Sequence, residues 1–226
     1  MSGKREKALV LLSGGQDSTT CLYWAIDRYG SKQVSSVSFD YGQKHRIELE
    51  SASSVAKAAG VENVLLPIDT FAALGGDALT DAATPVDAEA DNRTDLPVTF
   101  VAGRNLIFIT YAAALAYRRG IQNIVAGVAQ TDYSGYPDCR EETIEALQRA
   151  IQLGMEYEFV IHTPLMHRSK RETVELAIEL RALDAMALTH TCYNGVRPPC
   201  GKCAACELRA KGFSEAGVPD PLLHLR

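Results

Sequence analysis

Four cysteines near the end of the chain have the spacing of a metal site. Cys192, Cys200, Cys203 and Cys206 follow the pattern Cys-x7-Cys-x2-Cys-x2-Cys in a segment rich in Pro and Gly. Thiolates two residues apart in a tight turn can meet one ion, and four of them satisfy tetrahedral zinc. An iron–sulfur cluster is the chemical alternative, because four-cysteine sites serve both. We expect zinc, in a closed structural site that leaves no open position for catalysis.

A second chemical signal is a loop rich in Ser and Gly. Ser13-Gly14-Gly15-Gln16-Asp17-Ser18 lies between the apolar run 8–12 and a helical pattern. Two successive glycines allow a tight turn, and the N-terminus of the next helix carries partial positive charge, so the loop suits a phosphate. The string is neither GxxxxGK[ST] nor GxGxxG. The alternative without function is a plain turn with Asp17 or Ser18 as the helix N-cap; in the functional interpretation, Asp17 could hold magnesium.

Three polar strings, 39–45, 101–105 and 132–140, contain the remaining candidates for catalysis. Strings 39–45 and 132–140 follow expected strands, and 101–105 precedes an expected helix. We expect all three at the carboxyl ends of the strands, where ligands of open α/β sheets bind. Their cations could neutralise phosphates or a substrate carboxylate, and their tyrosines could stack on a flat heterocycle. The candidate catalytic residues are Lys44, Arg104, Asp138 and Arg140; Asp132, Tyr133 and Tyr136 are candidates for substrate contact.

The elements that must position these residues alternate between strands and helices. Short β-rich runs predict strands within 8–12, 34–39, 61–68, 123–128 and 159–162. Helical spacing predicts helices over 19–29, 47–59, 105–119, 141–153 and 169–183, three of them followed by Gly60, Gly120 and Gly154 as stop residues. Such alternation predicts a doubly wound α/β fold with a mainly parallel sheet.

Two segments break this alternation. Segment 74–97 is acidic and has no sustained periodicity, so it is either a solvated loop or a functional lid. Segment 189–226 holds the cysteines, four Pro and little regular pattern. We therefore expect a nucleotide-binding catalytic domain over 1–188, with a small zinc-binding segment over 189–226 packed on it.

Composition and charge argue against several classes of protein. The net charge is −5, which argues against a general binder of nucleic acid or of anionic membranes. The apolar run after the charged N-terminus is too short for a signal-peptide core, and nowhere do about 18 apolar residues follow one another. We expect a cytoplasmic location, where cysteines stay reduced. Packing explains Cys21 adequately, whereas Cys139 lies in the loop 136–140, where a reactive thiol is the alternative to the favoured packed one.

The motifs resemble a known family. SGGQDS is the signature of the PP-loop ATP pyrophosphatases, which split ATP between the α- and β-phosphates. With FDYGQKH, GRN, DYSGYPDCR, TPLM, TCYNG and CGKCAAC, the sequence is similar to the 7-cyano-7-deazaguanine synthases of queuosine biosynthesis from about Ala8 to Gly212. A departure is Ala102, where many members have Pro before GRN.

The resemblance implies a Rossmann-like fold of the adenine nucleotide alpha hydrolase type, a homodimer and one zinc held by the four cysteines. It implies ATP as co-substrate with magnesium, and conversion of 7-carboxy-7-deazaguanine and ammonia to the nitrile through adenylated intermediates and an amide. The 226 residues leave no room for a glutaminase domain, so we expect free ammonia or a partner protein to supply the nitrogen. The residues implied for ATP are Leu12, Ser13, Gly14, Gly15, Gln16, Asp17, Ser18, Thr19, Thr20, Cys21 and Leu22.

Two other functions stay open at this point. A tRNA thiolation enzyme would also adenylate its substrate and would then use a catalytic cysteine such as Cys139, but it needs an RNA-binding surface that a net charge of −5 disfavours. A zinc-ribbon module that binds nucleic acid on an inactive nucleotide-binding fold is the alternative from another class.

Overall fold

The fold was analysed in a computed structural model of the chain, which describes residues 6–43, 46–75, 77–81, 84–85, 96–130 and 135–224. The candidates Lys44, Asp132 and Tyr133 lie outside the described residues.

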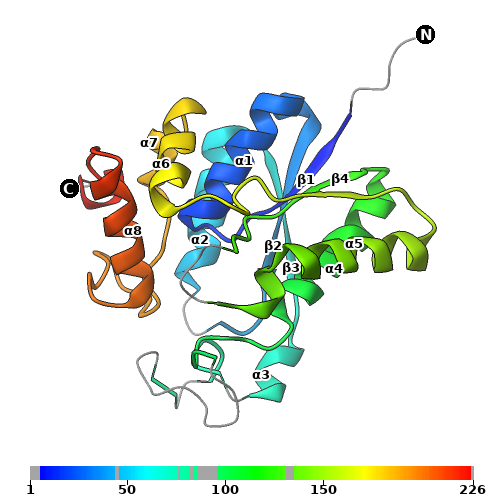
Figure 1. Ribbon diagram of the computed structural model, residues 1–226, viewed down its shortest axis with the longest axis horizontal. Helices are drawn as coiled ribbons and strands as arrows, with labels where there is room; N and C mark the ends of the chain where they lie inside the picture. The colour runs from blue at the N-terminus through cyan, green and yellow to red at the C-terminus, as the bar shows by residue number, and fades with distance from the viewer. Residues whose placement is uncertain are drawn as a thin grey trace.

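One five-stranded parallel sheet forms the centre of the fold (Figure 1). Its order is β3-β2-β1-β4-β5, so the chain first builds outward from β1 on one side and then crosses to the other. Between β1 and β4 the strand order reverses, and ligands bind at such a point, beyond the carboxyl ends of the strands. The strands are β1 (Ala8–Leu11), β2 (Val34–Asp40), β3 (Glu62–Pro67), β4 (Asn123–Val125) and β5 (Val160–His162).

Helices cover both faces of the sheet (Figure 1). Helices α1, α2 and α6 lie on one face and α4 and α5 on the other, as the two main hydrophobic clusters also indicate. The helices are α1 (Gln16–Tyr29), α2 (Ile47–Ala59), α3 (Thr70–Leu74), α4 (Arg104–Arg119), α5 (Glu141–Met155), α6 (Lys170–Glu179), α7 (Leu183–Met186) and α8 (Ala204–Glu215). Short 3-10 turns occur at Ser31–Gln33, Pro137–Cys139 and Pro221–His224.

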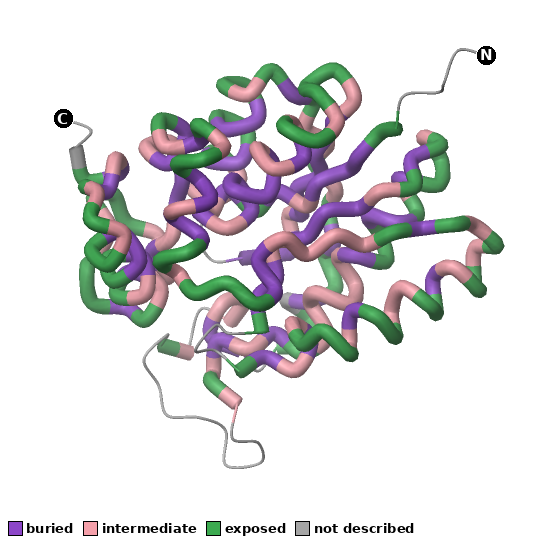
Figure 2. The backbone as a smooth tube through the Cα atoms, turned by 45° about the horizontal axis from the view of Figure 1, so that its top comes forward, coloured by how far each residue is buried: buried purple, intermediate pink, exposed green. Residues whose placement is uncertain are grey.

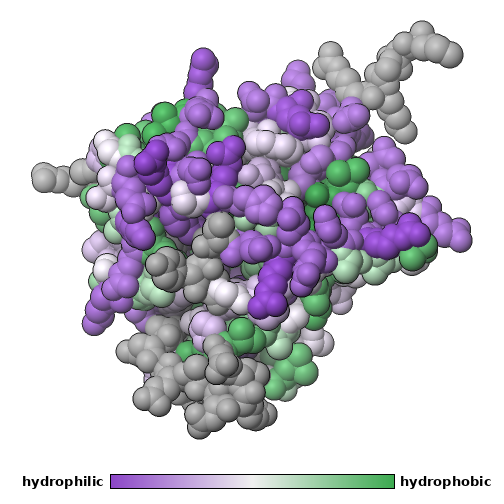
Figure 3. Space-filling view, viewed as in Figure 1, coloured by the Kyte–Doolittle hydropathy of each residue, from purple (hydrophilic) through white to green (hydrophobic). Residues whose placement is uncertain are grey.

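Alternation along β1 shows how the sheet divides the core. Ala8 and Val10 pack under α1 and α2, whereas Leu9 packs under α4, and all three are fully buried. Successive side chains of a strand point to opposite faces, so a strand covered on both sides is apolar throughout. Figure 2 shows this central region as the most continuously buried part of the backbone. The face seen in Figure 3 is mainly hydrophilic, and none of the described helices is long and apolar enough to span a membrane.

The five predicted strands and the parallel α/β class are confirmed, but two predicted helix ends are wrong. Helix α5 continues through Gly154 to Met155 and is ended instead by Glu156, whose φ of 47° is left-handed. The helix predicted over 169–183 is interrupted at Arg181, whose φ is 57°, and the chain then forms the separate turn α7.

The C-terminal segment is more regular than its sequence indicates. Cys203 is the N-cap of the twelve-residue helix α8, which packs against α6. Phe213 of α8 belongs to a buried cluster with Val174 and Met186. At Gly212 a Cβ atom would lie 3.0 Å from Lys170, so glycine allows the two helices to approach closely.

Candidate functional site

A cavity of about 330 Å³ opens at the carboxyl ends of β1, β2 and β4. This is the size range of small-molecule sites and the place that the strand order predicts. Its wall includes the 13–18 loop, the first turns of α2, α4 and α6, and parts of the C-terminal segment. Among the described part of segment 74–97, Leu79 also lines it.

The 13–18 loop has the geometry of an anion site. Gly14 has a φ of +86°, and a Cβ there would lie 2.4 Å from the backbone oxygen of Glu48, so only glycine fits. Gly15 is the N-cap of α1, which excludes the plain turn capped by Asp17 or Ser18. The first backbone N–H groups of α1 therefore have no side-chain cap and no acceptor inside the helix. Ser13 Oγ and Ser18 Oγ lie 3.0 Å apart beside them.

Lys170 adds a cation that the sequence did not reveal. Its Nζ lies 2.7 Å from Oδ2 of Asp17, and both side chains are partly buried on the cavity wall. The second carboxylate oxygen of Asp17 and the amide nitrogen of Gln16 are buried, with no hydrogen-bond partner among the described residues. Lys170 begins α6, 153 residues after Asp17, so no local spacing could have connected the two.

Of the predicted rim cations that the structure describes, Arg104 lines the cavity and Arg140 does not. Nη1 of Arg104 donates to the hydroxyl of Tyr41 at 3.3 Å, and its guanidinium lies 5.7 Å from the centre of that ring. Burial alone would lower the pKa of Arg104, but two tyrosines and Glu48 around it raise that pKa above its ordinary value. The guanidinium therefore stays charged inside the cavity wall.

Three predicted rim residues that the structure describes, Tyr136, Asp138 and Arg140, do not line the cavity. Asp138 is buried, and its Oδ2 accepts a hydrogen bond of 3.0 Å from the backbone N–H of Asn105, at the start of α4. Arg140 is exposed and is the N-cap residue of α5. Tyr136 is buried, with its hydroxyl 2.7 Å from Thr99 Oγ1. Asp138 therefore fixes the helix that begins with Arg104.

The sequence window proposed for ATP divides into two parts. Leu12, Ser13 and 15–18 line the cavity. Thr19, Thr20, Cys21 and Leu22 are buried inside α1, away from its wall. Burial raises the pKa of the Cys21 thiol, as expected of a cysteine that packs.

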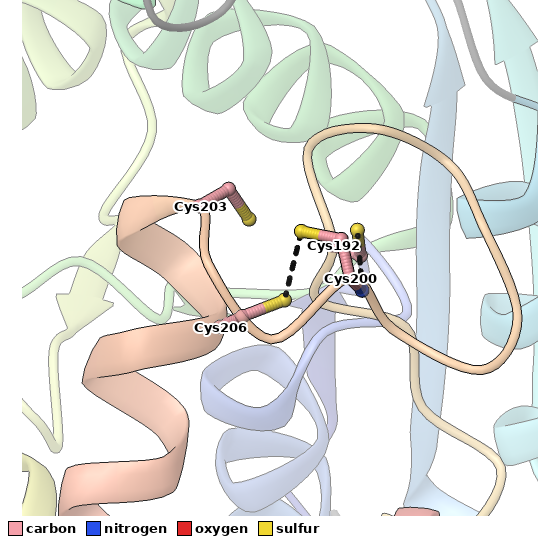
Figure 4. Close-up of side chains that lie close together, drawn as sticks. All are labelled: Cys192, Cys200, Cys203 and Cys206. Atoms are coloured by element: carbon pink, nitrogen blue, oxygen red, sulfur yellow. Dashed lines mark hydrogen bonds between the residues drawn. The ribbon is translucent and has the colours of Figure 1, made fainter.

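The four cysteines come together as one cluster (Figure 4). Their sulfur atoms all lie within 4.8 Å of one another, and Sγ of Cys200 is 4.0 Å from Sγ of Cys206. Tetrahedral zinc with Zn–S bonds of about 2.3 Å needs sulfurs about 3.8 Å apart, so the cluster fits a metal ion. The backbone N–H of Lys202, with the side chain of Asn194, lowers the pKa of the Cys200 thiol to about 6. That thiol is thus prepared to ligate as thiolate.

Residues 189–192 connect this cluster to the 13–18 loop. The backbone N–H of His190 donates to the carbonyl oxygen of Gly14 at 2.9 Å. Nε2 of His190 lies 2.8 Å from the carbonyl oxygen of Cys192, the first cysteine of the cluster. One short segment therefore touches both the loop and the candidate metal site.

Arg209 of α8 holds the same segment from the other side. It forms a buried ion pair with Asp220, with contacts of 2.6 and 2.8 Å. It also donates to Thr189 Oγ1 at 2.7 Å, Thr191 Oγ1 at 3.0 Å and the carbonyl oxygen of Met186 at 3.1 Å. These five bonds use every N–H of the guanidinium, which makes Arg209 a structural residue although it borders the cavity.

Comparison with known proteins agrees with these features. The family described as "Queuosine biosynthesis protein QueC" matches residues 7–217. A "7-cyano-7-deazaguanine synthase" of Chromobacterium violaceum is 63% identical over 218 residues, which are 96% of this chain and 93% of that protein. The protein of the same description from Laribacter hongkongensis is 62% identical over 219 residues, covering 97% and 95%.

Among solved structures, a "predicted subunit of tRNA methyltransferase" from Methanocaldococcus jannaschii has a TM-score of 0.50 at 16% identity. The match covers 77% of this chain and 75% of that one, and it supports the fold alone. The sequence matches over nearly the whole length are the stronger finding: this chain belongs to the QueC family of queuosine biosynthesis proteins.

Proposed function

We propose that the chain is an ATP-dependent 7-cyano-7-deazaguanine synthase, which converts 7-carboxy-7-deazaguanine and ammonia to the nitrile. The observation that supports the proposal most is that a single cavity combines a site for phosphates with a site for a flat, anionic substrate. The 13–18 loop and Lys170 form an anion-binding end, while Tyr41 and Arg104 form an aromatic and cationic wall beside it. Family membership supplies the substrate class.

In this reaction two oxygen atoms must be adenylated in turn, first that of the carboxylate and then that of the amide. A carboxylate is a poor electrophile, so its oxygen first attacks the α-phosphorus of ATP, pyrophosphate leaves, and a mixed anhydride forms. Ammonia attacks the carbonyl carbon, AMP leaves with that oxygen, and loss of a proton gives the amide. The amide oxygen then attacks the α-phosphorus of a second ATP, and pyrophosphate leaves. AMP leaves again with the oxygen, the nitrogen loses its protons, and the nitrile remains.

The residues have distinct proposed roles in these steps. Backbone N–H groups at the start of α1, with Ser13 and Ser18, hold the phosphates and orient the α-phosphorus for in-line attack. Lys170 contributes positive charge where pyrophosphate develops, since a charge aligned in advance stabilises the transition state. Arg104 offsets charge near the reacting carboxylate, and we retain Lys44 for a similar role.

Two of the predicted rim residues have more distant proposed roles. Asp138 positions α4 and therefore Arg104. Arg140, which is exposed, is proposed to meet substrate phosphates only at the mouth of the site. Magnesium would accompany ATP as its counterion, with the unpartnered oxygen of Asp17 as its protein contact.

The C-terminal part has a structural role in this proposal. Cys192, Cys200, Cys203 and Cys206 would hold one zinc ion, which supplies no chemistry to the reaction and fixes the fold of 189–226 against 1–188. We propose that the chain acts in the cytoplasm as a homodimer, without direct contact to nucleic acid or membrane. Sedimentation of the purified protein tests the homodimer.

An end-point assay by mass spectrometry tests the reaction. Purified protein is incubated with Mg-ATP, ammonium and 7-carboxy-7-deazaguanine. The expected result is nitrile with two AMP for each nitrile. Accumulation of amide with one AMP would limit the activity to the first half of the reaction. A folded protein that retains its metal and forms no AMP would refute the proposal and favour a binding module.

A further inference from the structure

Glu48 is a carboxylate on the cavity wall. It lies in the first turn of α2, is partly buried and lines the cavity. Within the described part of the chain its side chain makes no hydrogen bond, and no cation lies within ion-pair distance of it. The group that acts on it from a distance is Arg104, which donates instead to Tyr41. A carboxylate removed from bulk water in this way needs donors that something else must supply.

The position of Glu48 is fixed relative to the phosphate loop. A Cβ on Gly14 would meet the backbone oxygen of Glu48 at 2.4 Å and the backbone nitrogen of Ala52 at 2.6 Å. The first turn of α2 therefore packs directly on the loop that would hold ATP. A substrate whose carboxylate meets the α-phosphate would extend along the wall on which Glu48 lies.

Aromatic side chains provide the rest of that wall. Phe39 and Phe108 are stacked, with ring centres 4.5 Å apart, and Tyr41 meets Phe108 edge to face at 5.2 Å. All three line the cavity with Glu48. A flat heterocycle in van der Waals contact with these rings would bring its polar edge to the carboxylate.

We propose that Glu48 recognises the 2-amino-pyrimidinone edge of the substrate, by accepting hydrogen bonds from its ring N–H and its exocyclic amino group. The inference rests on the proposed function, which supplies the 7-deazaguanine ring. That edge presents two donors side by side, and an ionised carboxylate has two acceptor oxygens and no donor. Glu48 thus selects rings that carry the amino group, while the 13–18 loop binds ATP.

Binding measurements without turnover test this role. We compare the dissociation constants of 7-carboxy-7-deazaguanine and of its analogue lacking the 2-amino group by calorimetry. The wild-type protein is expected to prefer the amino compound by roughly 10²-fold, because the analogue leaves a charged acceptor unpaired. Glu48→Gln, which places an amide donor opposite the substrate donors, is expected to weaken binding of the amino compound roughly 10²-fold and to abolish the preference. Binding of Mg-ATP to the same variant should stay at the wild-type value.

Two further variants make the result specific. Glu48→Asp keeps the charge on a shorter arm, so it should bind more weakly than wild type and still prefer the amino compound. Glu50→Gln removes an exposed carboxylate from the same turn of α2 and should change neither constant. Thermal melts of all three variants establish that they are folded.

Two results would overturn the assignment. If Glu48→Gln binds both compounds as wild type does, Glu48 does not recognise the ring. If the variant loses Mg-ATP affinity and keeps the preference for the amino compound, Glu48 serves the nucleotide instead. Failure of the proposed function would look different, because the wild-type protein itself would then bind no 7-carboxy-7-deazaguanine and form no nitrile.

Discussion

The ion pair of Arg209 with Asp220 allows a prediction whose size follows from the structure. Only 4% of the Arg209 side chain and 7% of the Asp220 side chain are exposed. Arg209→Met keeps most of the apolar stem but leaves the carboxylate of Asp220 buried without a counter-charge, with the backbone N–H of Leu222 as its remaining donor. Breaking a buried pair from one side destabilises a protein by about 3–5 kcal/mol. For a chain of this length, such a loss lowers the melting temperature by about 6–20 °C.

The same substitution should also affect the proposed nucleotide site at the 13–18 loop. Thr189 and Thr191 lose their donors, and the segment between them carries the His190 amide that binds Gly14. We therefore expect weaker ATP binding in Arg209→Met at temperatures where the protein is still folded. Calorimetric unfolding and ATP titration measure the two effects. The matched control is Arg171→Met, whose exposed pair with Glu175 contributes under about 0.5 kcal/mol.

A double variant distinguishes this explanation from simple loss of packing. Adding Asp220→Asn to Arg209→Met removes the unpaired charge and should restore part of the stability. A single variant within about 1 kcal/mol of wild type, a difference typical of ordinary substitutions, would refute the reasoning. So would a double variant whose loss equals the sum of the two single losses, since the groups would then act independently.

Four more results are expected. Gly14→Ala should abolish ATP binding in a folded chain, because its Cβ would meet backbone atoms at 2.4 and 2.6 Å; unchanged ATP affinity would contradict this. Lys170→Met should weaken ATP binding about 10–100-fold by calorimetry and leave the affinity for the deazaguanine unchanged. Removal of the metal by a chelator should lower the melting temperature and the ATP affinity together, since residues 189–192 join both sites; metal-free protein that binds ATP normally would contradict the coupling. Burial raises the pKa of Glu48. Ionisation of this side chain therefore lowers the stability of the folded protein at pH values above the raised pKa, and it has no effect on stability at pH values below the ordinary carboxyl range. Glu48→Gln should therefore melt higher than wild type at neutral pH and no higher near pH 4, in melts recorded across that range.

The sequence predicted the features that local patterns determine. Strand β1 is a continuous apolar run, as expected of a strand buried on both faces, and β2 was predicted from the β-rich run 34–39. The 13–18 loop could also be predicted from local sequence, because two glycines before a helix determine its backbone conformation. The cysteine spacing predicted a cluster that the structure confirms as a possible metal site.

Contacts between distant residues escaped the same reasoning. Lys170 looks like an ordinary first-turn residue until α6 brings it to Asp17. Glu48 looks like an acid placed to favour a helix N-terminus, and nothing in the sequence shows that it faces a cavity. Helix α8 was missed because Cys, Gly and Pro before it gave the whole segment an irregular pattern.

The hydrogen bond between His190 and Gly14 determines when the proposed nucleotide site can form during synthesis of the chain. The 13–18 loop is among the first parts of the chain to be made, yet its outer support comes from residue 190, which Arg209 and Asp220 hold in turn. A nascent chain can pair β1 with β2 early, since those contacts are local, but it cannot complete the loop. The nucleotide site therefore becomes competent only after residue 220 has been made, so unfinished chains should not bind and split ATP.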